Sequence, residues 1–205
     1  ESFTYSKELV GLSITHLIEQ VVKLPNLNNL LQITEPNIFD LKTIFSQDLT
    51  EIDTLSIRSF SPKLLKLKEY KKYDNIVLFF SLDTIKNPEK VLEYCHKILN
   101  DNGNIIINFF NCKSIFSLSR LLNNIDIDYL FYDSKRANLF NIDSMYYLLN
   151  KAHFIPTNTI PVVFPETNMH SYSQSVIIGL FKKFNKKSDD LYNLSYTFVC
   201  KKAKI

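Results

Sequence analysis

Glycine is scarce in this sequence. Only Gly11, Gly103 and Gly179 occur among 205 residues, where an average chain of this length would have about fourteen. Nucleotide-binding α/β enzymes place several glycines at the turn after the first strand, because the backbone must approach the ligand closely there. None of the three glycines lies at such a turn. The sequence therefore excludes a glycine-rich phosphate loop of the usual kind.

Cysteines, long apolar runs and net charge are also low in this sequence, and each limits the classes of protein to which the chain can belong. The three cysteines, Cys95, Cys112 and Cys200, lack Cys-x-x-Cys spacing, so we expect a cytoplasmic protein without a disulfide framework or a metal site. No apolar run reaches the roughly 20 residues of a membrane span, and no signal-peptide pattern opens the chain. The net charge of +3 is too small to imply a nucleic-acid partner by itself.

The most informative stretch predicts a strand, a helix and a second strand. Asn75–Phe80 and Asn104–Phe110 are apolar runs rich in β-forming residues, typical of buried strands. Between them, Asn87 can cap a helix, Pro88 suits its first position, and Glu89 suits the positive end of its dipole. This pattern predicts a βαβ unit with parallel strands and a right-handed crossover.

The periodicity of the remaining chain predicts a single α/β domain. Asn102-Gly103 is expected to close the central helix, because this pair tolerates a positive φ, and Asp143 is expected to cap a later helix. Pro156 and Pro161 indicate an edge or bent strand. The other expected helices cover 6–23 and 37–46 and lie within 111–123, and the other expected strands cover 30–34, 55–60, 154–164 and 192–202. Residues 174–184 fit either a helix or a strand, and an amphipathic helix is favoured.

Several motifs resemble the class I S-adenosylmethionine (SAM)-dependent methyltransferases. Leu82-Asp83-Thr84 is similar to the family's Leu-Glu-His motif, and Leu99-Asn100-Asp101-Asn102-Gly103 is similar to its Leu-Lys-Pro-Gly-Gly turn. The 138–145 segment is similar to Phe-Phe-Thr-x-x-Ser-Leu. Lys151-Ala152-His153-Phe154 stands where the family has Ala-Gly-Phe, and Ser195-Tyr196-x-Phe198 resembles its terminal strand.

This resemblance implies a Rossmann-like methyltransferase fold. The expected sheet has seven mostly parallel strands, helices on both faces and an antiparallel C-terminal strand. Residues 1–24 would form an N-terminal helix and residues 25–205 the α/β core of one domain.

The resemblance also implies a SAM site, which this sequence alters. Gln32 stands where the family has an acid, and Thr34, Pro36 and Ile38 stand near the glycine positions of its Gly-x-Gly-x-Gly turn. Arg58 or Ser59 stands where a carboxylate would bind the ribose, and arginine has only donors. Arg58 can instead bind an anion or form a structural salt bridge. The candidate cofactor contacts are Thr34, Glu35, Asn37, Arg58, Ser59, Ser81 and Leu82.

Two residues are candidates for accepting a proton in catalysis. Asp83 follows the predicted strand through Phe80, and ligands of open α/β sheets bind at the carboxyl ends of strands. Asp83 can act as a general base, contact the cofactor, or only cap the next turn. His170 lies beside Glu166 in a polar segment and is the other candidate.

Three functions fit these observations. The first is a divergent SAM-dependent methyltransferase acting on a small-molecule or glycan acceptor. The second is an inactive methyltransferase-like domain that has lost SAM and serves as a binding or scaffolding subunit for a protein partner. The third is binding of phosphate or nucleic acid through Arg58 and the lysine-rich C-terminal segment.

Overall fold

We describe the fold from a computed structural model. The structure describes residues 2–24, 27, 29–34, 40–45, 51–56, 71–115, 117–118, 138–163, 176–179 and 189–203, and of residues 2–10 it describes the backbone only. The helices are α1 (Ser2–Val22), α2 (Leu41–Ile44), α4 (Ser81–Thr84), α5 (Pro88–Ile98), α7 (Ile142–Lys151) and the 3₁₀ helix η4 (Asp189–Leu191). The strands are β1 (Leu30–Thr34), β2 (Ile52–Ser56), β3 (Tyr73–Phe79), β4 (Leu99–Phe110), β5 (Phe154–Val163) and β6 (Asn193–Lys202).

The strands form one mixed sheet in the order β2-β1-β3-β4-β6-β5. Strands β1 to β4 pair in parallel, whereas β6 runs antiparallel between β4 and β5. This arrangement confirms the expected Rossmann-like fold with an antiparallel C-terminal strand. Six strands lie within the described residues, one fewer than the seven expected.

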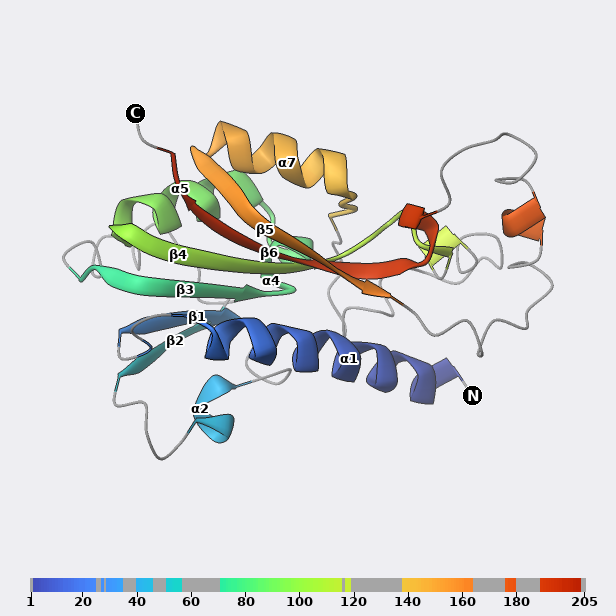
Figure 1. The fold of residues 1–205 in the computed structure, drawn as a ribbon, viewed down its shortest axis with the longest axis horizontal. Helices are drawn as coiled ribbons and strands as arrows, with labels where there is room; N and C mark the ends of the chain where they lie inside the picture. Colours follow the sequence, from blue (N-terminus) through green and yellow to red (C-terminus); the bar gives the residue numbers. More distant parts are fainter. Residues whose placement is uncertain are drawn as a thin grey trace.

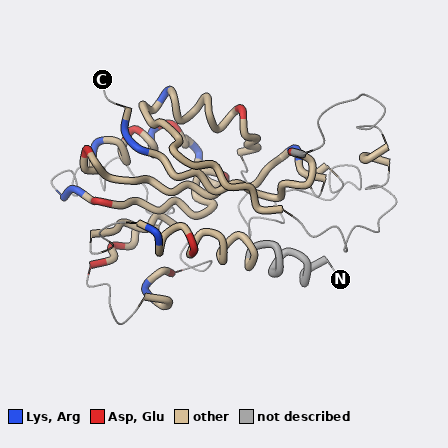
Figure 2. Tube along the Cα trace, viewed as in Figure 1, with Lys and Arg blue, Asp and Glu red and all other residues tan. Residues whose placement is uncertain are grey.

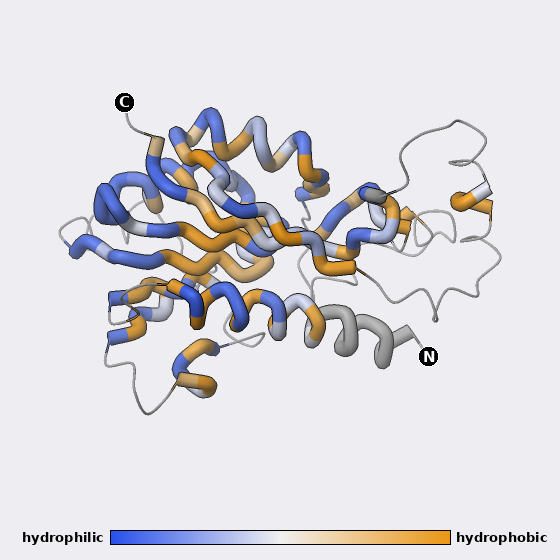
Figure 3. Tube along the Cα trace, in the orientation of Figure 1, coloured by the Kyte–Doolittle hydropathy of each residue, from blue (hydrophilic) through white to orange (hydrophobic). Residues whose placement is uncertain are grey.

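Helices cover both faces of the sheet (Figure 1). On one face α5 and α7 enclose the larger apolar cluster, which includes Ile76, Ile107 and Phe109. On the other face Leu17 and Val21 of α1 pack with Val77, Phe79 and other residues in a second cluster. Strand interiors are accordingly hydrophobic, as Figure 3 shows. Burial on both faces explains why the parallel strands read as continuous apolar runs.

The predicted start of α5 is confirmed, but its predicted end is wrong. Asn87 caps the helix through its side chain, which accepts from the Lys90 amide at 3.2 Å, and Pro88 is the first helical residue. The helix ends at Ile98, and β4 begins at Leu99 without a turn between them. Gly103 lies within β4, and no glycine in the described residues has a positive φ.

Gly103 is nevertheless constrained by packing. Strands β3 and β4 shift register where Tyr73 pairs with Leu99 and Asn75 with Asn104, so residues 100–103 bulge from the ladder. A β-carbon on Gly103 would lie 2.8 Å from the Asp74 carbonyl oxygen and 2.7 Å from the Leu99 side chain. Close approach of the backbone, not backbone flexibility, therefore requires glycine here.

Two further boundaries differ from expectation. Helix α7 is capped by Asn141, whose side chain accepts from the Ser144 amide at 3.0 Å, while Asp143 lies in the first turn. The second strand begins at Ile52 rather than at 55, and the predicted residues 57–60 lie outside the described residues. Its register is set by pairing with β1, where Leu30 lies level with Ile52 and Thr34 with Ser56.

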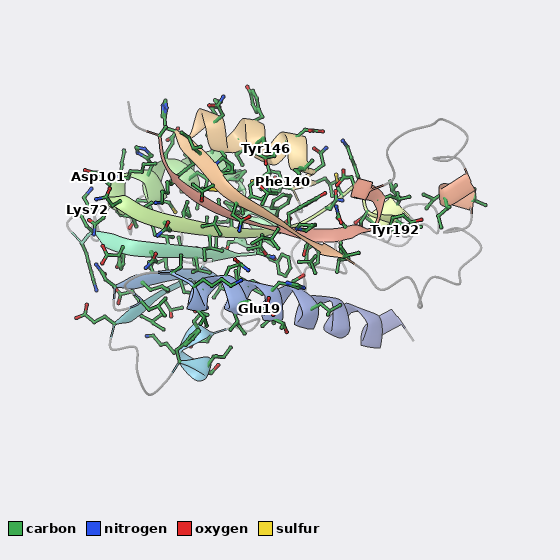
Figure 4. All side chains as sticks on the ribbon, in the orientation of Figure 1. Glu19, Lys72, Asp101, Phe140, Tyr146 and Tyr192 are labelled. Atoms are coloured by element: carbon green, nitrogen blue, oxygen red, sulfur yellow. The ribbon has the colours of Figure 1, made fainter. Side chains whose placement is uncertain are left out.

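Charged residues gather at the amino edge of the sheet, as Figure 2 shows. Figure 4 places Lys72 and Asp101 there and Tyr192 near the opposite end. The Asp53 carboxylate on β2 contacts Lys71 at 3.0 Å and Tyr73 at 2.6 Å. These contacts join β2 to the start of β3, far along the strands from the carboxyl edge where ligands are expected.

Candidate functional site

The strand order reverses between β1 and β3. The chain steps from β1 to β2 on one side and from β3 to β4 on the other. Ligands of open α/β sheets bind outside the carboxyl ends of the strands at such a switch point. Thr34 ends β1, and Phe80 and Ser81 follow β3. The structure therefore brings Thr34, Ser81, Leu82 and Asp83, all expected site residues, to this edge.

Ser81 joins the ends of the two strands. Its hydroxyl donates a hydrogen bond to the Ile33 carbonyl of β1 and lies 3.2 Å from the Phe79 carbonyl of β3. The side chains of Thr34, Ser81 and Leu82 are buried, and Leu82 belongs to the larger apolar cluster. These three side chains therefore pack inside the protein beneath the strand ends and do not face solvent.

The Asp83 carboxyl is also buried, with 1% of the residue exposed. Its Oδ1 accepts from the Phe110 amide at 3.3 Å, and its Oδ2 has no hydrogen-bond partner. Burial raises the pKa of Asp83 well above its usual value, and the bond from Phe110 opposes this only in part. The carboxyl therefore holds its proton more tightly than an exposed aspartate.

Asn138 fixes α4 from a distant part of the chain. Its side-chain amide donates to the Leu82 carbonyl at 2.7 Å and to the Ile85 carbonyl at 2.6 Å, and its backbone amide donates to the Asp83 carbonyl at 2.6 Å. The sequence motif beginning at Asn138 indicated the element but not this contact. Asn138 thus supplies donors to the carboxyl end of a four-residue helix.

Phe80 was not among the predicted site residues. It has a left-handed backbone with φ 46° and ψ 20°, a conformation that bulky residues rarely adopt. Its ring stacks on that of Phe110, with centroids 3.9 Å apart and planes 1° apart. Local sequence signals such as glycine or asparagine, which usually mark this conformation, are absent here.

A cluster of hydrogen-bonded polar side chains holds the carboxyl end of β4 in place. The Asn111 amide donates to the Asp190 carbonyl at 2.8 Å, to the Asp190 carboxylate at 3.1 Å and to the Asn193 carbonyl at 2.9 Å. The Tyr196 hydroxyl donates to the same carboxylate. Burial and then this bond raise the pKa of Tyr196. The cluster holds η4 and the start of β6 against the carboxyl edge.

Other predicted site residues lie outside the described residues. These are Glu35, Asn37, Arg58, Ser59 and His170. The lysines at 182–187, invoked for nucleic-acid binding, also lie outside them. Within the described ranges, no cluster of three or more histidine, cysteine or acidic residues could hold a metal ion, and no helix is long and apolar enough to cross a membrane.

The described residues provide the strand ends beside which SAM is expected, but not the carboxylate that usually binds its ribose. The switch point offers the ends of β1 and β3, at Thr34 and Ser81. The described part of β2 ends at Ser56, level with Thr34, and its acid Asp53 contacts Lys71 and Tyr73 instead. These residues are compatible with a cofactor held by the ends of β1 and β3, without help from a carboxylate on this strand.

Comparison with known proteins gives the same fold. A family model described as a methyltransferase domain matches residues 14–157. A SAM-dependent methyltransferase from Archaeoglobus fulgidus superposes with a TM-score of 0.61 at 14% identity, covering 98% of this chain and 100% of the other. No curated protein matches the sequence.

Two further solved structures carry named activities. A possible histamine N-methyltransferase from Thermotoga maritima has a TM-score of 0.58 at 12% identity, covering 98% of this chain and 95% of its own. The 1,6-didemethyltoxoflavin-N1-methyltransferase from Burkholderia thailandensis, with S-adenosylhomocysteine (SAH) bound, has a TM-score of 0.54 at 11% identity, covering 100% and 82%. At these identities the likeness concerns the fold.

Proposed function

The chain belongs to the family of methyltransferase domains, whose cofactor is SAM, and from that premise we propose that it is a divergent methyltransferase acting on a small-molecule or glycan acceptor. The observation that carries this proposal is the match over residues 14–157, which includes the ends of both strands at the switch point. Small-molecule methyltransferases among the structural neighbours support the choice of acceptor class.

SAM supplies a reactive methyl group, so the protein has to orient the acceptor and exclude water. The ends of β1 and β3, joined by the bond from Ser81 to Ile33, would hold the ligand in a fixed position. Thr34, Ser81 and Leu82 support this edge through their buried side chains. Glu35, Asn37, Arg58 and Ser59 remain the proposed cofactor contacts of the adjoining segments.

Of the two candidate proton acceptors, we assign the role to His170. The Asp83 carboxyl is buried, its pKa is raised, and its Oδ1 faces the Phe110 amide. A general base must come within hydrogen-bond reach of the acceptor, and the burial of this carboxyl prevents that in the present conformation. His170→Gln should slow methyl transfer to an identified acceptor and leave SAH affinity unchanged.

A second function is favoured by a specific observation. The side chains of Thr34, Ser81 and Leu82 are buried, and the described part of β2 ends without a carboxylate. These features also suit a domain that no longer binds SAM and serves as a binding or scaffolding subunit for a protein partner. Core packing persists in such a domain because folding still requires it.

Calorimetric titration of the purified chain with SAM and with SAH tests the proposal. One-site binding in the micromolar range would support the methyltransferase and direct the search to acceptors. Absence of heat up to millimolar ligand would contradict it and favour the subunit without SAM. A parallel titration of Asp83→Asn should give the wild-type affinity if this side chain is structural.

A further inference from the structure

Phe80 has an unusual backbone for an aromatic residue. Its φ is 46°, and among the described non-glycine residues only His153, at 59°, shares a positive φ. A bulky side chain in the left-handed region persists only where its surroundings over-determine it. Strain of this kind concentrates at functional sites and switch regions, so the surroundings of Phe80 are informative.

Packing holds the Phe80 ring in place. The ring is stacked on Phe110 at 3.9 Å between centroids and tilted against Phe79 at 4.5 Å. Only 3% of the residue is exposed, and it shares an apolar cluster with Leu17 and Val21 of α1. The Phe80 amide also donates to the Asn108 carbonyl of β4 at 3.1 Å. The ring is therefore fixed between the end of the sheet and α1.

The position of Phe80 coincides with the switch point. Phe80 directly follows β3 and directly precedes Ser81, whose hydroxyl bonds to the Ile33 carbonyl of β1. A ligand of this fold is expected beside these strand ends. A large aromatic residue thus directly follows the strand end beside which a ligand of this fold is expected.

We propose that Phe80 is a plug in the cofactor site. Its ring occupies part of the space that an adenosyl ligand needs, and the ligand must displace it from the stack on Phe110. The inference depends on the proposed function for the identity of the ligand. It predicts that the wild-type chain binds SAH weakly and that removal of the ring strengthens binding.

The test is calorimetric titration of SAH into the wild type, Phe80→Gly and Phe110→Leu. Glycine suits the left-handed backbone and removes the ring, whereas Phe110→Leu removes the stacking partner and leaves Phe80 in place. We expect Phe80→Gly to bind SAH about tenfold tighter or more, and Phe110→Leu to bind with intermediate affinity. His153→Gly is the matched control, because it relaxes a positive φ at the amino end of β5, and it should bind like the wild type.

The outcomes separate this inference from the proposed function. Binding by Phe80→Gly but not by the wild type would support the plug and contradict SAM binding by the natural chain. Equal affinity of the wild type and a folded Phe80→Gly would overturn the plug and leave the proposed function intact. Binding by neither would overturn both. Circular dichroism checks folding; if Phe80→Gly is unfolded, Phe110→Leu decides, and wild-type affinity in that variant overturns the plug.

Discussion

The Asp83 carboxylate oxygen Oδ1 accepts a hydrogen bond from the backbone amide of Phe110 at 3.3 Å. Strand β3 has turned away at Phe80, so this carboxyl takes the place of the next carbonyl in the β3–β4 ladder. Asp83 thereby supplies a hydrogen-bond acceptor to a backbone amide near the end of β4.

Asp83→Asn should flatten the dependence of stability on pH. Burial raises the pKa of Asp83, so between the unfolded value of about 4 and the raised folded value the folded chain binds more protons than the unfolded chain. Stability is therefore greatest below the unfolded pKa and falls as pH rises through this window. Asparagine does not titrate, so we expect the stability of the variant to change less with pH across this window.

Urea unfolding of the wild type and Asp83→Asn at several pH values between about 4 and 8 measures this effect. Asp143→Asn is a suitable control, because the Asp143 side chain is 80% exposed. A wild-type slope that persists unchanged in Asp83→Asn would assign the pH dependence to other groups.

Gly103→Ala should destabilise the fold by about 1–3 kcal/mol. The new β-carbon would lie 2.8 Å from the Asp74 carbonyl oxygen, which the sheet holds in place, and 2.7 Å from Leu99. Gly11→Ala is the matched control: a β-carbon there meets nothing within 4 Å, and alanine should stabilise α1 by about 0.5–1 kcal/mol. Thermal unfolding followed by circular dichroism compares them, and equal midpoints would contradict the close approach at Gly103.

Asn141→Ala should cost about 1 kcal/mol, because it removes the N-cap of α7. The Asn141 side chain accepts from the Ser144 amide, and the Ser144 hydroxyl accepts from the Asn141 amide at 2.9 Å. Asp143→Ala removes only an exposed ion pair with Lys113 at 3.2 Å, so its effect should stay within about 0.5 kcal/mol. Chemical denaturation of both variants measures the difference, and a larger loss in Asp143→Ala would reverse the assignment of the cap.

His153→Gly should increase the free energy of unfolding by about 1 kcal/mol, because it relieves a φ of 59° in a residue with a β-carbon. The neighbouring variant Ala152→Gly should lose about the same amount, since Ala152 has an ordinary φ of −88°. Opposite shifts in the urea midpoint are expected. If His153→Gly is the less stable of the two, the histidine ring contributes more through packing than its backbone strain costs.

Local chemistry allowed some elements to be predicted accurately. The Leu30–Thr34 strand is a short apolar run bounded by polar residues, and Asn87-Pro88 combines a cap with a fixed φ; both predictions are confirmed. The predicted start of β2 was wrong because Ile52 and Leu55 are both buried, and only pairing with β1 sets the residue at which the strand begins. The bulge at Gly103 likewise depends on Asp74, which lies on another strand.

The candidate site was predictable in position but not in detail. The sequence placed Ser81, Leu82 and Asp83 after the predicted strand that ends at Phe80. The Leu82-Asp83-Thr84 motif follows that strand, and ligands are expected at the carboxyl ends of such strands. It did not reveal that Asp83 is buried against Phe110 or that Phe80 has a positive φ. Both features arise from contacts between residues about 30 positions apart (27 for Asp83 and Phe110), which no local pattern encodes.

The outer strand β5 has a consequence for the behaviour of the protein at high concentration. It is ten residues long and pairs only with β6 in the described sheet, and an outer strand of this kind can recruit strands from other molecules. Pro156 and Pro161 lack amide protons and interrupt any continuous new ladder along it. Replacing these prolines with residues that have a backbone amide proton would allow a continuous ladder along this edge and favour aggregation through it.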